Sequence, residues 1–466
     1  MSGRTWRRAV LTVTATATAT VALVVPLTSS ADADRGWRSS TAEAGRVAQN
    51  GGTAVLPGLD AAAAIPGQAA VNTAIHGPLS EPAVGDVNGL VIDATTGQLL
   101  WSRTPNSAIA PASLTKILTA AAALTTLGPQ DVPTTTLATT GTVTSGVLAG
   151  DLYLRGSGDV LLSASGSGAW PARAGVDQLV AGLRAAGVTA IHGRLIGDGS
   201  LFTGPTTADS WEPSYVTGGS VAPVTALGVD EAGAAVGRGN RSGDPRRDAI
   251  AALRTALGRA GITVTGKATV GTTPPAARVV ASVAGTPVSA SVEEMLENSD
   301  NDMAESLGRR VAIKLGRPAT FAGAASAIRS AIADLGISDP GLALDDASGL
   351  SHNDRVAPGT IAAVLRLATV PAANGGRPQL RPIIDGLSVA AFDGTLAPRY
   401  RTGASVPGAG IVRAKTGSLT GVSSLAGSVV TASGRQLLFV WVSDDVRSRA
   451  LAEAALDEAA SALSGL

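Results

Sequence analysis

Residues 130–288 interrupt this chain with a segment whose composition differs from that of the sequence on either side. It contains short apolar stretches typical of strands at residues 148–156 and 188–199, and then a helical pattern that leads into another strand. A single hydrophobic core stops growing near about 250–300 residues, whereas this chain has 466. We therefore predict an α+β domain, residues 130–288, inserted into a larger domain made of residues 85–129 and 289–466.

The sequence outside this segment predicts an antiparallel sheet flanked by helices. Apolar runs bounded by turn residues indicate the strands, and apolar residues at helical spacing indicate the helices. Strand patterns occur at residues 88–101 (a hairpin), 409–415, 423–432 and 435–443, and helical patterns occur at residues 113–126, 302–315, 319–335, 360–367 and close to the C-terminus.

The N-terminal residues have the features of an export signal. An arginine-rich start precedes an apolar run that ends at Leu27, and small residues follow around Ala33. We predict that residues 1–33 are a signal peptide, with an uncleaved membrane anchor as the alternative, and that residues 34–84 are a flexible linker. The folded protein is then extracytoplasmic, either in the cell envelope or secreted.

The charge balance and the absence of cysteine exclude several classes of function. Lysine and arginine number 36 and are balanced by 36 acidic residues, so no net field would attract a nucleic acid. A chain without cysteine has no thiol nucleophile, disulfide or cysteine-ligated metal. The motifs H-E-x-x-H and G-x-S-x-G are also absent, which removes the signatures of zinc proteases and of nucleophile-elbow hydrolases.

Ser113 and Lys116 form an S-x-x-K motif at the first turn of the helix predicted for residues 113–126. Residues three apart share a helix face, and a serine hydroxyl becomes a good nucleophile only when a neighbour takes its proton. Lysine can do so if its charge is locally disfavoured, whereas arginine stays protonated. The alternative is a helix-capping serine followed by an exposed lysine.

Lys415, Thr416 and Gly417 form a K-T-G motif at the end of an apolar strand pattern, and Ser418 follows it. On a sheet edge that faces a cleft, the lysine would offer positive charge and the hydroxyls would offer hydrogen bonds. The glycine would leave room for a substrate backbone beside the strand. A simple hairpin turn is the alternative.

Ser299 and Asn301 form an S-x-N motif in the loop before the helix predicted for residues 302–315. Ser351 and Asn353 also fit S-x-N, but they lie in a turn-rich loop. We prefer Ser299 and Asn301 because they lie between the other two motifs, next to a helix able to pack on the first. The alternative for these residues is helix capping.

Together, the three motifs resemble the signature of the serine penicillin-binding-protein and β-lactamase superfamily. The long gap between the first two motifs makes the chain similar to the class C low-molecular-mass penicillin-binding proteins, over about residues 85–466. These are D-alanyl-D-alanine carboxypeptidases that also cleave peptidoglycan cross-links. The resemblance implies an α+β fold, with a transpeptidase-like domain whose antiparallel sheet is flanked by helices and an inserted α+β domain between the first and second motifs.

The resemblance also implies a role for each motif residue. Ser113 would attack the carbonyl between two D-alanines, Lys116 would remove its proton, and Ser299 would relay a proton to the leaving amine. Backbone N–H groups of Ser113 and Ser418 would form the oxyanion hole. The residues expected to bind the substrate are Asn301, Lys415, Thr416, Gly417 and Ser418.

This chemistry implies no metal and no cofactor. The expected partners are peptidoglycan stem peptides and, as covalent inhibitors, β-lactams, with no nucleic acid and no membrane contact beyond an uncleaved N-terminal segment. The family's usual D-G-S-G-L-S loop reads D-A-S-G-L-S here, from Asp346 to Ser351, and we interpret it as a structural turn.

Two other functions stay open from the sequence. A β-lactamase or esterase on the same fold would need efficient deacylation, and we identify no acidic residue as a second base for that water. A catalytically silent cell-wall-binding module would carry the motifs without aligned side chains. The sequence does not rank carboxypeptidase against endopeptidase activity.

Overall fold

The computed structural model describes residues 59–60, 62–164, 171–235 and 238–466. The predicted signal or anchor at residues 1–33 lies outside these ranges. Within them, no helix has both the length and the apolar character that a membrane span requires.

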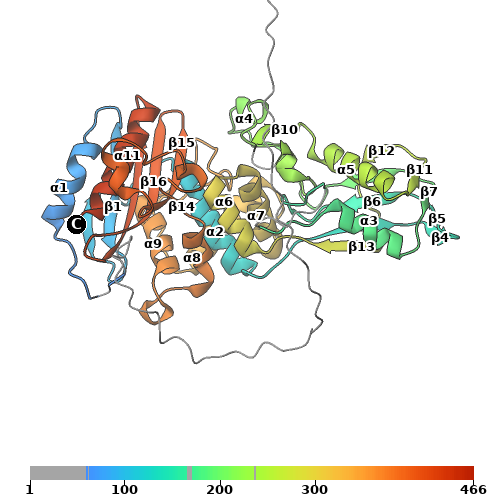
Figure 1. Ribbon diagram of the computed structural model, residues 1–466, viewed down its shortest axis with the longest axis horizontal. Coiled ribbons are helices and arrows are strands. Elements are labelled where there is room, and N and C mark those ends of the chain that lie inside the picture. The colour runs from blue at the N-terminus through green and yellow to red at the C-terminus, as the bar shows by residue number, and fades with distance from the viewer. Residues whose placement is uncertain (1–58, 61, 165–170, 236–237) are drawn as a thin grey trace, which may run out of the picture. The chain divides into compact units, whose positions relative to one another are not determined.

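A six-stranded antiparallel sheet organises the larger domain, with the strand order β14-β15-β16-β17-β1-β2. The early strand β1 therefore lies between β2 and β17, a strand close to the end of the chain, as the blue and orange-red strands of Figure 1 show. The sheet consists of β1 (Asp86–Asp93), β2 (Leu99–Arg103), β14 (Ser388–Val389), β15 (Arg413–Leu419), β16 (Val422–Val430) and β17 (Gln436–Asp444).

The predicted hairpin and the three C-terminal strands are confirmed, but the first of these strands ends later than we expected. We expected the strand that carries the K-T-G motif to end there, but β15 begins at Arg413 and continues to Leu419. The motif thus lies inside the strand, because Thr416 to Leu419 pair with β16 before the chain turns.

Helices cover both faces of this sheet. Alternate strand residues point to opposite faces, so Phe439 packs on the side of α1 and α11 whereas Leu438 and Val440 pack on the side of α2 and α9. Strands buried on both faces read as nearly continuous apolar runs, as the C-terminal strands do. The first side consists of α1 (Gln68–Leu79) and α11 (Arg449–Ser464).

The flexible linker predicted for residues 34–84 is wrong for its last part. Residues Gln68–Leu79 form α1, and Val71, Ile75 and Leu79 are buried against α11. These three residues are four apart, so they form a narrow apolar stripe between small and polar residues. A helix this short is stabilised by tertiary packing more than by its own propensity, and the sequence pattern was correspondingly weak.

In the described part of the chain, four helices pack around α2 on the other side of the sheet. Four consecutive alanines, 120–123, are fully buried in α2, and their small side chains let neighbouring helices pack closely. The helices are α2 (Thr115–Thr126), α6 (Val288–Asn298), α7 (Asn301–Lys314), α8 (Phe321–Asp334) and α9 (Pro358–Thr369), with the short α10 (Pro382–Asp385) beside them.

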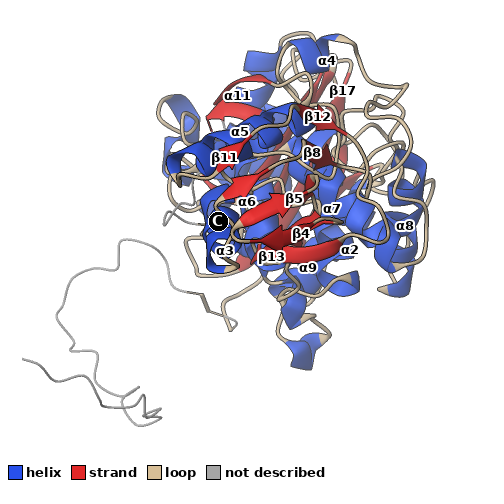
Figure 2. Cartoon of the chain, turned by 90° about the vertical axis from the view of Figure 1, so that its right-hand side faces the viewer, coloured by secondary structure: helices blue, strands red, loops and turns tan. Residues whose placement is uncertain are grey.

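The segment between α2 and α6 folds around its own sheets. Helices α3 and α5 pack on them (Figure 2) and share a separate apolar core. The elements are α3 (Val176–Ala185), α4 (Ser214–Thr217), α5 (Pro245–Arg259), β3 (Thr134–Thr139), β4 (Thr142–Thr144), β5 (Val147–Ala149), β6 (Leu152–Arg155), β7 (Ala190–Ile191), β8 (Leu195–Asp198), β9 (Gly233–Ala235), β10 (Arg238–Arg241), β11 (Thr263–Val264), β12 (Ala268–Val270) and β13 (Arg278–Ala284).

Strands β3 to β13 pair only with one another in the described part of the chain. They form a five-stranded sheet, β12-β8-β6-β3-β13, a four-stranded sheet, β11-β7-β5-β4, and the ribbon β10-β9. We therefore propose residues 130–288 as the limits of the inserted domain.

Candidate active site

Ser113 lies in a tight 3₁₀ turn, Ala112–Leu114, immediately before α2. Ala112 has a φ of 50°, in the left-handed region that is unfavourable for a residue with a β-carbon. Lys116 follows one turn later, and its Nζ lies 2.9 Å from Ser113 Oγ. The i, i+3 spacing thus brings the two groups into hydrogen-bond distance.

Two further oxygen atoms surround the lysine. Lys116 is fully buried, and its Nζ donates to Asn301 Oδ1 at 2.7 Å and to the carbonyl oxygen of Ser348 at 2.6 Å. Asn301 is the first residue of α7, and Ser348 lies in the loop between α8 and α9. Lys116 is therefore held by three separate segments of the chain.

Burial lowers the pKa of Lys116 to about 8, because the ammonium form loses its hydration. The carboxylates of Asp346 and Asp300 oppose this shift without cancelling it. With such a pKa, roughly a tenth of the molecules carry a neutral lysine at pH 7. A neutral amine beside a serine hydroxyl is able to accept its proton.

The S-x-N motif occupies the junction between α6 and α7. Ser299 ends α6 with a φ of 58°, and Asp300 caps α7 by accepting a hydrogen bond from the N–H of Met303 at 2.7 Å. This turn directs Asn301 toward Lys116. The Ser299 side chain is half-buried and makes no hydrogen bond to any described residue. Asn301 is therefore hydrogen-bonded to the lysine, whereas Ser299 is not.

Residues 415–418 lie beside an open stretch of the sheet edge. Strand β14 pairs only with the two residues before Lys415, so the rest of that edge has no strand partner among the described residues. Backbone groups of an antiparallel strand alternate between its two edges. Because the β15–β16 hairpin closes on the pair Leu419 and Val422, the N–H of Ser418 is directed to the open edge.

The polar side chains of β15 are engaged by different neighbours. Lys415 is fully buried and donates to the carbonyl oxygen of Thr416 at 2.7 Å. The Thr416 hydroxyl donates to Thr395 Oγ1 at 2.9 Å, and the Ser418 hydroxyl donates to Glu453 on α11 at 3.2 Å. In this state the Ser418 hydroxyl is therefore turned toward α11.

Lys415 has a pKa well below its ordinary value. Burial is the main cause, and the positive charges of Lys116 and Arg399 add to it. The charge of Lys116 thus disfavours protonation of Lys415.

Comparison with known proteins assigns this arrangement to a family. The model of the D-Ala-D-Ala carboxypeptidase 3 (S13) family matches residues 71–237 and 231–463. The chain belongs to this family. It is a serine-type D-Ala-D-Ala carboxypeptidase, as the three motifs predicted.

Curated relatives agree with this assignment, and a solved structure shares the fold. A carboxypeptidase of Mycobacterium tuberculosis is 38% identical over 84% of this chain and 83% of its own length. Carboxypeptidase DacB of Mycolicibacterium smegmatis is 37% identical over 94% of each chain. The crystal structure of penicillin binding protein 4 from Haemophilus influenzae shares the fold, with a TM-score of 0.68 and 23% identity over 84% of this chain and 98% of that one.

The S13 fold supplies several contacts that sequence reasoning missed. The loop read as a structural turn provides the Ser348 carbonyl, and the inserted domain provides the Ser220 carbonyl, which accepts from Asn301 Nδ2 at 2.8 Å. A backbone carbonyl carries no residue-type signal. The only indication that this loop is close to the site was that residues 348–351 match the family's usual S-G-L-S sequence.

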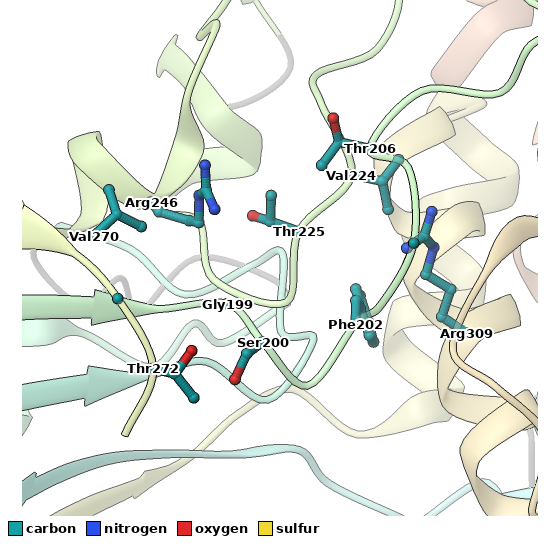
Figure 3. A pocket seen from close by; sticks show the side chains of 12 residues that line it. Gly199, Ser200, Phe202, Thr206, Val224, Thr225, Arg246, Val270, Thr272 and Arg309 are labelled. Atoms are coloured by element: carbon teal, nitrogen blue, oxygen red, sulfur yellow. The ribbon is translucent and has the colours of Figure 1, made fainter. Parts of the chain in front are cut away.

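A cavity of about 290 Å³ lies apart from the three motifs. Figure 3 shows Phe202, Thr225 and Arg246 of the inserted domain around it, with Arg309 of α7 on one side. None of the motif residues lines it. In the described parts of the chain, no group of three histidine, aspartate or glutamate residues is arranged to hold a metal ion.

Proposed function

We propose that this S13 carboxypeptidase cleaves the bond between the two D-alanines of a peptidoglycan stem peptide through an acyl-enzyme on Ser113. The observation that carries the proposal is the 2.9 Å approach of the buried Lys116 Nζ to Ser113 Oγ. As Oγ bonds to the carbonyl carbon, its proton passes to Lys116, and the C–N bond then breaks. The terminal D-alanine leaves with a proton on its amine, and water hydrolyses the ester.

The open edge of β15 binds the substrate backbone as an added strand. Lys415 receives the terminal carboxylate together with the Thr416 hydroxyl, and Asn301 holds the stem peptide. An anion at Lys415 offsets the burial and repulsion that lower its pKa. Substrate binding therefore favours the charged form of Lys415.

The N–H groups of Ser113 and Ser418 form the oxyanion hole. The outward direction of the Ser418 N–H supports this, and loss of one such donor costs roughly 10²–10³ in rate. Ser299 relays the proton to the leaving amine, and its hydroxyl makes no hydrogen bond to a described residue that would compete with this role.

The first test is labelling with a fluorescent penicillin, followed by peptide mapping of the adduct. We expect the label on Ser113. A label on Ser299 or Ser351, or no label on the folded protein, contradicts the proposal and favours the alternative of a catalytically silent cell-wall-binding module. Turnover of the penicillin as fast as that of a stem peptide would instead favour a β-lactamase.

We also propose D,D-endopeptidase activity on cross-linked peptidoglycan. The resemblance to class C penicillin-binding proteins supports it. Purified cross-linked muropeptides should yield monomers on incubation, as measured by mass spectrometry. Release of D-alanine without any monomers would contradict it.

We further propose that residues 1–33 direct export and are removed near residues 32–35. The arginine-rich start and the small residues around Ala33 support this. N-terminal sequencing of secreted protein is the test. Recovery of the intact terminus only in membranes would favour the anchor.

A further inference from the structure

We propose that the inserted domain positions the general base Lys116, through Trp211, Ser220 and Arg241. The inference rests on the proposed role of Lys116. Two of the three oxygen atoms around Lys116 Nζ belong to Asn301 and Ser348. Each of these two acceptors is held in place by a separate contact from the inserted domain.

The first contact fixes the amide of Asn301. Its Nδ2 donates to the carbonyl oxygen of Ser220 at 2.8 Å, while its Oδ1 accepts from Lys116 Nζ at 2.7 Å. A carbonyl only accepts hydrogen bonds. Ser220 therefore holds the amide nitrogen on its own side and leaves the amide oxygen facing the lysine.

The side chains of the two residues that flank Asn301 are held by one arginine. Arg241 Nη2 lies 2.8 Å from Asp300 Oδ2, and its Nη1 lies 3.0 Å from Asp302 Oδ2. All three side chains are largely buried, and Asp302 Oδ1 also accepts from the N–H of Ala222 at 2.9 Å. The planar guanidinium spans both carboxylates at once. Asn301, between them, cannot shift without breaking these contacts.

The second contact fixes the carbonyl of Ser348. The indole Nε1 of Trp211 donates to Asp346 Oδ2 at 2.8 Å. The other oxygen of Asp346 accepts from the N–H groups of Ser348 at 3.1 Å and Gly349 at 2.7 Å. Asp346 thus shapes the turn that presents the Ser348 carbonyl to Lys116, and Trp211 orients Asp346.

The turn also lies tightly against the nucleophile. Gly349 has a φ of 81°, and a β-carbon added to it would lie 2.0 Å from the carbonyl oxygen of Ala112. A displacement of this turn would therefore also displace Ala112, which immediately precedes Ser113.

Trp211 has a packing role that must be separated from its hydrogen bond. Its ring meets Phe321 edge to face, with centroids 5.0 Å apart. Trp211→Phe keeps an aromatic ring there but removes the indole N–H. Trp101→Phe is the matched control, because Trp101 lies on β2 at the opposite edge of the sheet from β15 and its indole makes no hydrogen bond to a described residue.

The experiment measures acylation of the full chain by benzylpenicillin at several concentrations and from pH 6 to pH 10. For Trp211→Phe we expect the limiting acylation rate constant to fall roughly tenfold, the size of effect that one lost hydrogen bond produces. The pre-acylation binding constant should stay within twofold, and the pH midpoint of acylation should move. Trp101→Phe should change neither the rate constant nor the midpoint.

Arg241→Lys provides a second variant, since one ammonium group cannot span both carboxylates as a guanidinium does. Its control is Arg310→Lys, because Arg310 is also largely buried but pairs with the single carboxylate of Asp131 at 2.7 Å. We expect a rate loss only for Arg241→Lys.

Circular dichroism confirms that each variant is folded. Wild-type acylation rates in both Trp211→Phe and Arg241→Lys, or equal losses in the two controls, would overturn the inference. Failure of the wild-type protein to acylate at Ser113 would instead overturn the proposed function, so the two failures are distinguishable.

Discussion

Gly417 and Ser113 approach so closely that no side chain fits between them. A β-carbon added to Gly417 would lie 3.0 Å from the backbone nitrogen of Ser113 and 2.3 Å from Ser424 Oγ. The Ser424 hydroxyl is itself fixed, because it donates to the carbonyl oxygen of Pro111 at 2.9 Å. The glycine of K-T-G is thus the point at which the third motif meets the first.

Gly417→Ala should therefore lower the acylation rate constant by at least about tenfold. The added methyl group pushes β15 away from the nucleophile turn, and so moves the N–H groups of Ser113 and Ser418 apart. Removing one oxyanion donor alone lowers the rate by roughly 10²–10³-fold. This value is the upper limit of the loss that we expect for Gly417→Ala. Stopped-flow acylation by a fluorescent penicillin measures the effect.

Gly258→Ala is the control for that substitution. Gly258 lies in α5, and an added β-carbon there meets nothing within 4 Å. Alanine is favoured over glycine inside a helix, so this variant should be slightly more stable and equally active. Equal activity of the Gly417→Ala variant would mean that the contact with Ser113 does not matter.

Lys116→Arg and Lys415→Arg should differ sharply, although both replacements keep a positive charge. A guanidinium cannot accept a proton at working pH. Lys116→Arg should therefore lower the second-order acylation rate by about 10²–10⁴, the usual contribution of a general base.

Lys415 has only to present charge to a carboxylate. Lys415→Arg should weaken capture of a stem peptide but leave measurable acylation by a reactive β-lactam. Both variants are compared with one penicillin after circular dichroism shows that they are folded. A Lys116→Arg enzyme that acylates nearly as fast as wild type would leave Lys116 as an orienting charge only.

The elements that carry the motifs could be predicted because their signals are local. Helical spacing located α2 beside Ser113, and apolar runs located β16 and β17. The helical pattern directly after Asn301 led us to prefer it over Asn353, and Asn301 does accept a hydrogen bond from Lys116. In each case the chemistry needs a particular side chain at a particular separation, and the sequence displays both.

The remaining contacts could not be predicted, because they depend on backbone atoms or on residues brought together only by the fold. The carbonyls of Ser220 and Ser348 could belong to any residue type. Trp211 and Asp346 are far apart in the sequence, and nothing local links an indole to a carboxylate. The narrow apolar stripe of α1 becomes meaningful only when α11 is present to cover it.

Acylation should accelerate with pH. The pKa of Lys116 is lowered to about 8, and only the neutral amine accepts a proton from Ser113. Below pH 8 the rate constant should therefore rise about tenfold per pH unit, and above it the rate should level off. The profile is measured from pH 6 to pH 10 as the rate of acylation by a fluorescent β-lactam whose own charge does not change over this range. A rate that is flat across this range would argue against a lysine base.

Glu305→Gln should make the protein more stable at high pH than the wild type. Glu305 is fully buried on α7, where its Oε1 accepts from the N–H of Ala347 at 3.0 Å. Burial, with the charge of Asp346, raises the pKa of Glu305 to about 8, against about 4.3 in an unfolded chain. Between those values the folded state holds a proton that the unfolded state has released, so the wild type loses stability as pH rises. Glutamine is neutral throughout and has no such loss.

One unit of pKa difference is worth about 1.4 kcal/mol, so the gap in the free energy of unfolding between variant and wild type should widen by more than about 1 kcal/mol from pH 5 to pH 8. Urea unfolding at both pH values measures it. A constant gap for Glu305→Gln would show that Glu305 is ionised in the folded protein throughout this range.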